Sequence, residues 1–412
     1  MKSIIETDRQ KKRELTLDNN KKLYNKTLLA CYLGFITQAI TANFTPLLFL
    51  MFNKNYEVSL GKIALIPAVF FLTQLVVDII CAQVVDKIGY RKCIITSCLC
   101  SAAGLVLLAF LPELFSDPFV GIIISVVVYA IGSGLVEVLG SPIVEACPFD
   151  HKEAVMSLLH SFYCWGSVGV IVISTLFFKF LGIGNWKILT CLWAVIPLFN
   201  IYNFATCPIE QPNGGEKGMG LVALFKLPLF WVAIILMICA GASELSMAQW
   251  ASAFAESALG LSKNIGDLAG PCLFAVAMGT VRAVFGKFGH KLNLMRFMIF
   301  SGVLCVVSYL LASLSTVPIL GLLGCILCGF SVAIMWPGTI SICSPRIPKG
   351  GTALFAMLAM SGDLGGAAGP AIVGNISQIF NNNLKAGLLA GSIFPVILIL
   401  MILLISTRKL QR

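Results

Sequence analysis

The sequence predicts an all-α membrane protein, in which twelve transmembrane helices form two six-helix pseudo-symmetric bundles. Of its 412 residues, 58% are hydrophobic and 12% are charged, whereas soluble domains carry about 25% charged residues. The chain also divides into twelve apolar runs, and about 20 apolar residues suffice to cross a bilayer. A polar turn that occurs at Gly89 recurs at Gly289, which indicates an internal duplication.

The apolar runs and the loops between them define the expected organisation. The expected spans are 27–51, 60–85, 93–111, 119–146, 154–182, 186–207, 228–252, 264–286, 294–314, 317–342, 351–380 and 386–406. The longest polar interruption contains PIEQPNGGEKGMG, which has the composition of a linker. The predicted organisation is a tail at 1–26, a six-helix bundle at 27–207, a linker at 208–227 and a second six-helix bundle with a short tail at 228–412.

The distribution of basic residues predicts the orientation in the membrane. With the N-terminus inside, 22 of the 29 lysines and arginines fall on the inner side and six on the outer side. This bias predicts a multi-pass protein of the cytoplasmic (plasma) membrane with both termini in the cytoplasm. The same bias explains the net charge of +10 without a nucleic-acid partner. The tail at 1–26 lacks the apolar core of a secretory signal.

Several other functional classes find no support in the sequence. It contains no nucleotide-binding loop and no Cys/His metal spacing, so we expect no enzymatic activity, no metal and no cofactor. The fifteen cysteines include many in apolar runs, where a free thiol behaves as a small hydrophobic group. The expected partners are the lipid bilayer and a small molecule, and we expect the protein to act as a monomer.

The two halves of the chain match beyond the repeated turn. Residues 134–142 (GLVEVLGSP) align with residues 329–337 (GFSVAIMWP). Gly166 and Gly169 likewise align with Gly366 and Gly369. Parallel repeats of this kind are typical of transporters with a cavity between two bundles.

The turn DKIGYRK resembles the loop between helices two and three of the major facilitator superfamily, and its second copy resembles the loop between helices eight and nine. The resemblance implies a cytoplasmic latch between the bundles in an outward-open state; a fixed salt bridge would use the same residues. Asp78 can pair with this turn or with the end of a neighbouring helix, and Arg282 is a possible partner for acids in the second half. The candidate gating residues are Asp78, Asp86, Gly89, Arg91, Lys92, Arg282, Lys287 and Gly289.

Four ionisable residues inside the spans are candidates for proton coupling or substrate binding, because each costs roughly 2.5–3.5 kcal/mol at mid-helix. Glu137 lies deep in span four and could bind a proton or a sugar hydroxyl. Glu244 could do the same in span seven, although it could also lie near the outer headgroups. His160 could titrate near neutral pH or act only in packing. Asp363 lies among glycines and alanines and should be enclosed by protein.

The remaining polar and aromatic residues inside the spans are candidates for lining a cavity. Trp250 could stack against a substrate or belong to the aromatic belt, and Trp336 could line the cavity or fill the gap between the halves. The full set of cavity candidates is Gln38, Asn43, Ser141, Trp165, Gln249, Trp250 and Trp336.

Glu137, Ser141-Pro142, the run LLHSF at 158–162 and Glu244 together resemble the fucose permease-like branch of the superfamily. That resemblance implies uptake of a sugar or sugar-like solute by proton symport. The alternative is a proton-driven drug or metabolite efflux antiporter. Exporters often carry a Gly-Pro signature in span five, where this chain reads GSVGV. A receptor with a transporter fold is a third possibility, although the chain has no sizeable soluble domain.

Overall fold

The structure is a computed structural model that describes residues 2–58, 60–210, 218–257, 268–381 and 383–406. The middle of the expected linker, the first residues of the expected span 264–286 and the end of the C-terminal tail lie outside these ranges. Twelve helical segments in the described ranges are long and apolar enough to cross a membrane. The all-α fold with twelve spans is therefore confirmed.

The helices follow the apolar runs of the sequence. Their bounds are α1 (Lys2–Asn43), α2 (Phe49–Asn55), α3 (Leu60–Ile88), α4 (Tyr90–Phe110), α5 (Pro118–Ala146), α6 (Lys152–Leu181), α7 (Trp186–Thr206), α8 (Leu221–Phe225), α9 (Pro228–Ser257), α11 (Leu273–Phe288), α12 (Leu294–Leu314), α13 (Pro318–Val332), α14 (Met335–Cys343), α15 (Gly351–Ile379), α16 (Leu384–Gly391) and α17 (Ile393–Ser406). The tenth span comprises α13 and α14, and the twelfth comprises α16 and α17.

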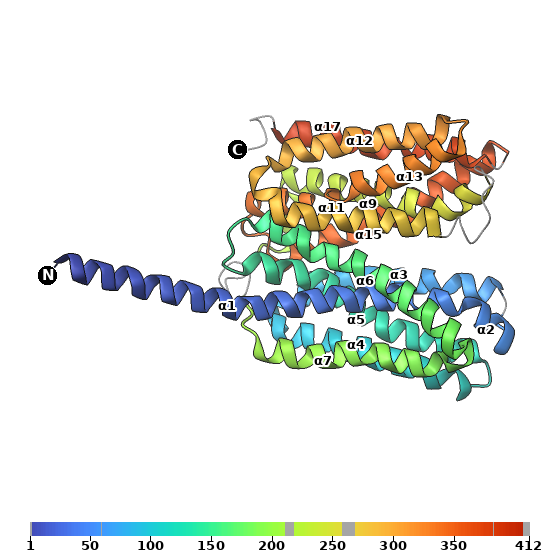
Figure 1. Ribbon diagram of the computed structural model, residues 1–412, viewed down its shortest axis with the longest axis horizontal. Coiled ribbons are helices and arrows are strands. Elements are labelled where there is room, and N and C mark those ends of the chain that lie inside the picture. Colours follow the sequence, from blue (N-terminus) through green and yellow to red (C-terminus); the bar gives the residue numbers. More distant parts are fainter. Residues whose placement is uncertain (1, 59, 211–217, 258–267, 382, 407–412) are drawn as a thin grey trace.

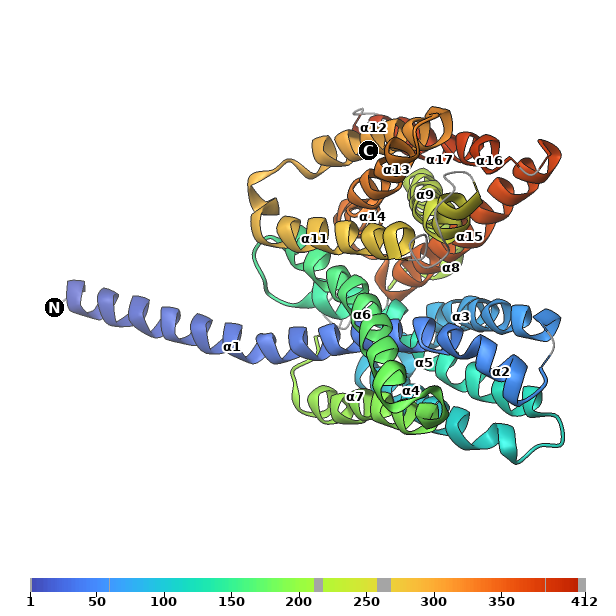
Figure 2. The same ribbon diagram turned by 45° about the vertical axis from the view of Figure 1, so that its right-hand side comes forward.

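The helices lie in two groups, with α1–α7 on one side and α9–α17 on the other (Figure 1). The groups meet where α3 and α5 pack against α15, and where α6 packs against α11 and α14. The first part of α1 projects away from the bundles (Figures 1 and 2). We call the end at which Gly89 joins α3 to α4 the Gly89 end.

Glycines permit the closest helix contact in the second group, between α9 and α15. A Cβ atom added at Gly365 would lie 2.0 Å from the carbonyl oxygen of Ile238, and one added at Gly241 would lie 2.2 Å from that of Gly362. Side chains at these positions would keep the backbones apart, so small residues allow this packing. The Gly/Ala composition noted around Asp363 thus has a structural basis.

The Gly89 end is closed by contacts between the two groups. The Tyr90 hydroxyl bonds to the Thr352 hydroxyl, and Thr352 donates to the carboxylate of Asp86. In addition, the backbone N–H of Met219, in the linker before α8, donates to the carbonyl of Lys349 at 2.6 Å and so ties the linker to the start of α15. These contacts place the start of α15 directly against the α3–α4 turn.

Candidate functional site

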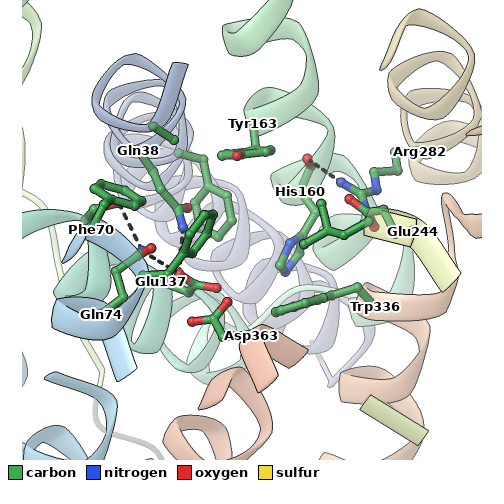
Figure 3. A pocket seen from close by; sticks show the side chains of 15 residues that line it. Gln38, Phe70, Gln74, Glu137, His160, Tyr163, Glu244, Arg282, Trp336 and Asp363 are labelled. Carbon is green, nitrogen blue, oxygen red and sulfur yellow. Dashed lines mark hydrogen bonds and ion pairs between the residues drawn. The ribbon is translucent and has the colours of Figure 1, made fainter. Parts of the chain in front are cut away.

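A cavity of about 120 Å³ lies at the centre of the protein, between the two bundles. About 10–15 Å³ on this measure is enough for one water molecule, so the cavity has room for several. Figure 3 shows polar and aromatic side chains that converge on it from both bundles. Its lining residues are Phe35, Gln38, Ala42, Phe70, Phe71, Gln74, Ser133, Glu137, His160, Tyr163, Glu244, Leu245, Arg282, Trp336 and Asp363.

Glu137 forms the polar centre of one side of this cavity. Its Oε2 atom accepts hydrogen bonds from the amide of Gln38 at 2.8 Å and from the amide of Gln74 at 3.0 Å. The same Gln74 amide lies 3.2 Å from the hydroxyl of Ser133. Asp363 of the other bundle points toward Glu137 (Figure 3). Helices α1, α3 and α5 therefore hold one carboxylate through two amides, opposite a second carboxylate.

Arg282 and Glu244 form a buried ion pair on the other side of the cavity. The Arg282 Nη2 atom lies 3.1 Å from Glu244 Oε2, and their side chains are 4% and 14% exposed. Arg282 Nη1 donates to the His160 carbonyl at 3.3 Å and contacts the Cys164 sulfur at 3.1 Å, both on α6. Arg282 therefore neutralises an acid in its own bundle and contacts the opposite bundle.

A break in the tenth span supplies a further acceptor for Arg282. In a continuous helix, the carbonyl of Ala333 would accept from the N–H of residue 337, but Pro337 has no N–H. The helix is interrupted between α13 and α14, and Arg282 Nε donates to the Ala333 carbonyl at 2.8 Å. The proline thus leaves a buried acceptor that a cation can use. The same break positions Trp336 at the cavity.

Asp78 is deeply buried on α3. It is 1% exposed, and neither carboxylate oxygen has a hydrogen-bond partner in the described part of the chain. Asp78 was expected to pair with the basic turn or with the end of a neighbouring helix, and neither pairing is formed in the described part of the chain. Arg91 of that turn instead donates to the carbonyls of Phe204 and Cys207 near the end of α7, because those terminal carbonyls lack helical partners.

Aromatic side chains form much of the remaining cavity wall. The ring of Trp336 lies directly on α15, where a Cβ added at Gly362 would come within 2.1 Å of it. Phe35 packs edge-to-face on His160 at 4.9 Å. Phe70 and Tyr163 complete the aromatic surface (Figure 3).

Several lining residues were missed by the sequence analysis. The lining residues that were not among the candidates are Phe35, Ala42, Phe70, Phe71, Gln74, Ser133, Tyr163 and Leu245. Within apolar spans, such residues look the same as residues that face lipid. One signal was available: Phe70 and Gln74 precede Asp78 at four-residue intervals, so all three lie near one helix face.

Five of the predicted cavity residues are not in the lining. Asn43 bonds to the Ala39 carbonyl and the Ser167 hydroxyl, and Ser141 lies 3.2 Å from His160 Nε2. Trp250 donates to the Pro370 carbonyl at 3.0 Å. Gln249 is exposed, and Trp165 is 41% exposed and packs beside Gly279.

The two repeated turns differ in conformation. Gly89 has φ of +96°, which favours glycine, whereas Gly289 has φ of −60°. Lys92 and Lys287 are exposed, and the Lys287 ammonium lies 5.4 Å from the Phe288 ring centre. The match in sequence therefore does not extend to the backbone geometry.

Residues 30–370 of the chain match the Major Facilitator Superfamily. No curated protein sequence matches the chain. Among solved structures, a variant of the E. coli fucose:proton symporter FucP has a TM-score of 0.79 at 14% identity, over 93% of this chain and 100% of that one.

Two further structures show the range of related transporters. The proton:xylose symporter XylE, bound to 6-bromo-6-deoxy-D-glucose, has a TM-score of 0.78 at 12% identity, over 92% of this chain and 95% of that one. The human organic anion transporter MFSD10 has a TM-score of 0.71 at 15% identity, over 92% and 99%. At these identities, the likeness shows the fold alone.

Proposed function

Because the chain belongs to the Major Facilitator Superfamily, it is a multi-pass secondary transporter and not an enzyme, and we propose that it moves a sugar or sugar-like solute together with protons. Transport proceeds by alternating access, in which the two bundles rock about the central cavity. The protein acts as a monomer in the cytoplasmic membrane, with both termini in the cytoplasm.

The hydrogen bonds from Gln38 and Gln74 to Glu137 are the main support for this proposal. Its Oε2 atom accepts from Gln38 and Gln74 at 2.8 and 3.0 Å beside the cavity. A carboxylate accepts hydrogen bonds from hydroxyl groups, and amides both donate and accept. Aromatic faces such as that of Trp336 suit the apolar face of a sugar ring. This combination favours an uncharged polyol.

The charge balance of the cavity supports proton coupling. Arg282 is already paired with Glu244 at 3.1 Å, whereas Glu137 and Asp363 face each other (Figure 3) without an ion pair in the described part of the chain. Two adjacent negative charges away from water are costly, and binding a proton removes one of them. The proposed coupling sites are therefore Glu137 and Asp363.

The comparisons are consistent with this choice of solute class. FucP is a fucose:proton symporter and XylE is a proton:xylose symporter. MFSD10 is an organic anion transporter. An anion would need a free cation in this cavity, but Arg282 is engaged by Glu244 and by α6. We therefore favour a neutral solute over an anion.

The turn at Gly89 is proposed to gate the cytoplasmic side. Asp86 and Tyr90 contact Thr352 across the two bundles. Arg91 links the turn to α7 of its own bundle by donating a hydrogen bond to the Phe204 carbonyl. The contacts to Thr352 must break when the cavity opens to this side, whereas the Arg91 contacts can persist.

Uptake into proteoliposomes tests the proposal. An inward proton gradient is expected to drive accumulation of at least one of radiolabelled L-fucose, D-xylose and D-glucose. Glu137→Gln should abolish accumulation but retain exchange of labelled for unlabelled sugar, whereas Glu113→Gln, an exposed carboxylate paired with Lys187, should behave as the wild type. If the uptake of all three sugars is independent of the proton gradient, proton symport is ruled out.

Efflux of an organic cation in exchange for protons is the second candidate. The observation that favours it is the acidic character of the cavity, because unpaired carboxylates attract cations. Under this alternative, inverted vesicles would accumulate cationic drugs when acidified inside, and expression would protect a drug-hypersensitive host. Sugar accumulation without such protection would reject it.

A further inference from the structure

A second cavity lies at the Gly89 end of the protein, where the two bundles close against each other. Its volume is about 650 Å³, within the range of roughly 300–1,000 Å³ that is usual for ligand pockets. It shares no lining residue with the central cavity. Helices α1, α5 and α6 and the start of the linker form one side, and the segment from Ser344 to the first turns of α15 forms the other. A molecule bound here would therefore contact both bundles.

The side of this cavity formed by the first bundle and the linker is polar and has more acids than bases. Glu145 lies one residue before the end of α5, and its Oε2 atom is buried without a hydrogen-bond partner in the described residues. Glu210 accepts a hydrogen bond from the Tyr24 hydroxyl at 2.6 Å. Lys152 is the one cation among the lining residues, and its Nζ atom donates to the backbone carbonyl of Glu145 at 2.5 Å. Neither carboxylate forms an ion pair within the described ranges.

The side formed by the second bundle is mainly apolar. Ile347, Leu354 and Phe355 line the cavity, and all three are buried. The N–H of Gly350 donates to the carbonyl of Ile347 at 2.8 Å, and the N–H of Leu354 donates to the carbonyl of Gly350 at 3.2 Å. These bonds hold the loop before α15 against the first turn of that helix, so the apolar wall is already formed. A hydrocarbon group placed on this wall would be removed from water, which is favourable.

These two sides together suit a ligand with one positive charge and an apolar body. An ammonium group has three donors and no acceptor, so it complements the carboxylate of Glu145, which has a free acceptor in Oε2. The hydrocarbon part of the same molecule would then face Leu354 and Phe355. An anion would meet two carboxylates and a single lysine that already donates to a carbonyl. A neutral polyol would leave the apolar wall without a partner.

We propose that this cavity is a regulatory site for a primary amine with an apolar body, and that the bound amine holds the Gly89 end closed. Gly351 lines the cavity and directly precedes Thr352, which contacts Asp86 and Tyr90. When those contacts break, the start of α15 leaves the first bundle and the site is divided. A ligand that binds only the closed arrangement increases its population. This site lies apart from the proposed solute site and goes beyond the proposed transport.

Direct binding of radiolabelled 2-phenylethylamine to the full-length protein tests the site. Equilibrium dialysis at neutral pH would use protein in lipid nanodiscs, and empty nanodiscs would correct for partition into lipid. We expect saturable binding that unlabelled 2-phenylethanol, the uncharged analogue, does not displace. Glu145→Gln should weaken binding by at least about tenfold, because hydrogen bonds to a charged group are the stronger ones. Glu153→Gln is the matched control, since Glu153 lies at the same end of α6 but does not line the cavity.

Closure of the Gly89 end is measured as a distance between spin labels at Lys92 and Lys349. These exposed positions belong to different bundles, and labels on unnatural amino acids avoid the fifteen native cysteines. The measurement would use Tyr90→Phe, which lacks the hydroxyl that bonds to Thr352 and therefore opens more readily. The amine should increase the short-distance population in proportion to the bound fraction, whereas 2-phenylethanol should leave it unchanged.

Four outcomes would overturn the proposal: no saturable binding, wild-type affinity in Glu145→Gln, a distance that bound amine does not change, and loss of binding in Glu137→Gln. The last would place the amine in the central cavity and favour the efflux candidate. Should Glu145→Gln fail to fold, Glu210→Gln, at an exposed position, must weaken binding instead. If the amine binds as expected while sugar uptake is independent of protons, the proposed symport fails and the regulatory site stands.

Discussion

The Nε atom of Arg282 donates to the carbonyl of Ala333 at 2.8 Å, in the gap between α13 and α14. Pro337 creates this acceptor because it cannot supply the helical N–H. The bond fixes the guanidinium so that Nη2 reaches Glu244 in the same bundle and Nη1 reaches α6 in the other. A single proline thus positions the cation that neutralises one half of the cavity.

Removal of Arg282 should destabilise the protein more than removal of the whole ion pair. Arg282→Met leaves Glu244 as a buried charge without its partner, which costs about 3–5 kcal/mol. Adding Glu244→Leu to this variant should recover much of that loss of stability, because neither charge of the ion pair is then left buried. Thermal unfolding in detergent, followed by intrinsic fluorescence, measures both variants. A double variant that is less stable than Arg282→Met would contradict this account.

Gly362 should be required for the position of Trp336. A Cβ at residue 362 would lie 2.1 Å from the indole ring, so Gly362→Ala forces the ring to move, at a cost of about 1–3 kcal/mol. The displaced ring enters the cavity, so we expect a higher KM for solute uptake. The second substitution Trp336→Phe shortens the ring and should partly restore KM. An unchanged KM in Gly362→Ala would show that Trp336 does not contact the solute.

The turn at Gly89 should tolerate no side chain. Its φ of +96° and ψ of 142° are accessible to glycine but strained for other residues, by about 1–3 kcal/mol. Gly89→Ala should therefore lower the thermal unfolding midpoint. Gly169→Ala is the matched control, because its Cβ would meet no atom within 4 Å and alanine stabilises a helix by up to about 1 kcal/mol. Equal effects of the two substitutions would refute the prediction.

The hydroxyl of Tyr90 should favour closure of the Gly89 end. Tyr90→Phe removes its bond to Thr352, and a hydrogen bond contributes about 0.5–1.5 kcal/mol. The open population should rise by about two- to tenfold, as measured with spin labels at Lys92 and Lys349. Tyr202→Phe, at a position 67% exposed on α7, serves as the control. No change in Tyr90→Phe would show that closure does not depend on this bond.

The sequence alone determined that the chain forms twelve membrane-spanning helices, with a duplicated turn at Gly89 and Gly289. It could do so because span length and hydropathy are local properties that the bilayer thickness constrains. It also identified Glu137, Glu244, His160 and Asp363, since an ionisable residue in an apolar run stands out without any knowledge of its neighbours. All four line the cavity.

Only the tertiary structure decided which side chains meet. Arg282 pairs with Glu244 and Gln38 with Glu137 across 38 and 99 residues of chain, and Asp78 is buried without a hydrogen-bond partner among the described residues. Helices that are apolar around most of their surface do not reveal their rotation, so Trp250 and Gln249 were expected at a cavity that neither lines. The rotation of each helix is set by packing against its neighbours. The glycines of α15, for example, pack against α9 within the second bundle.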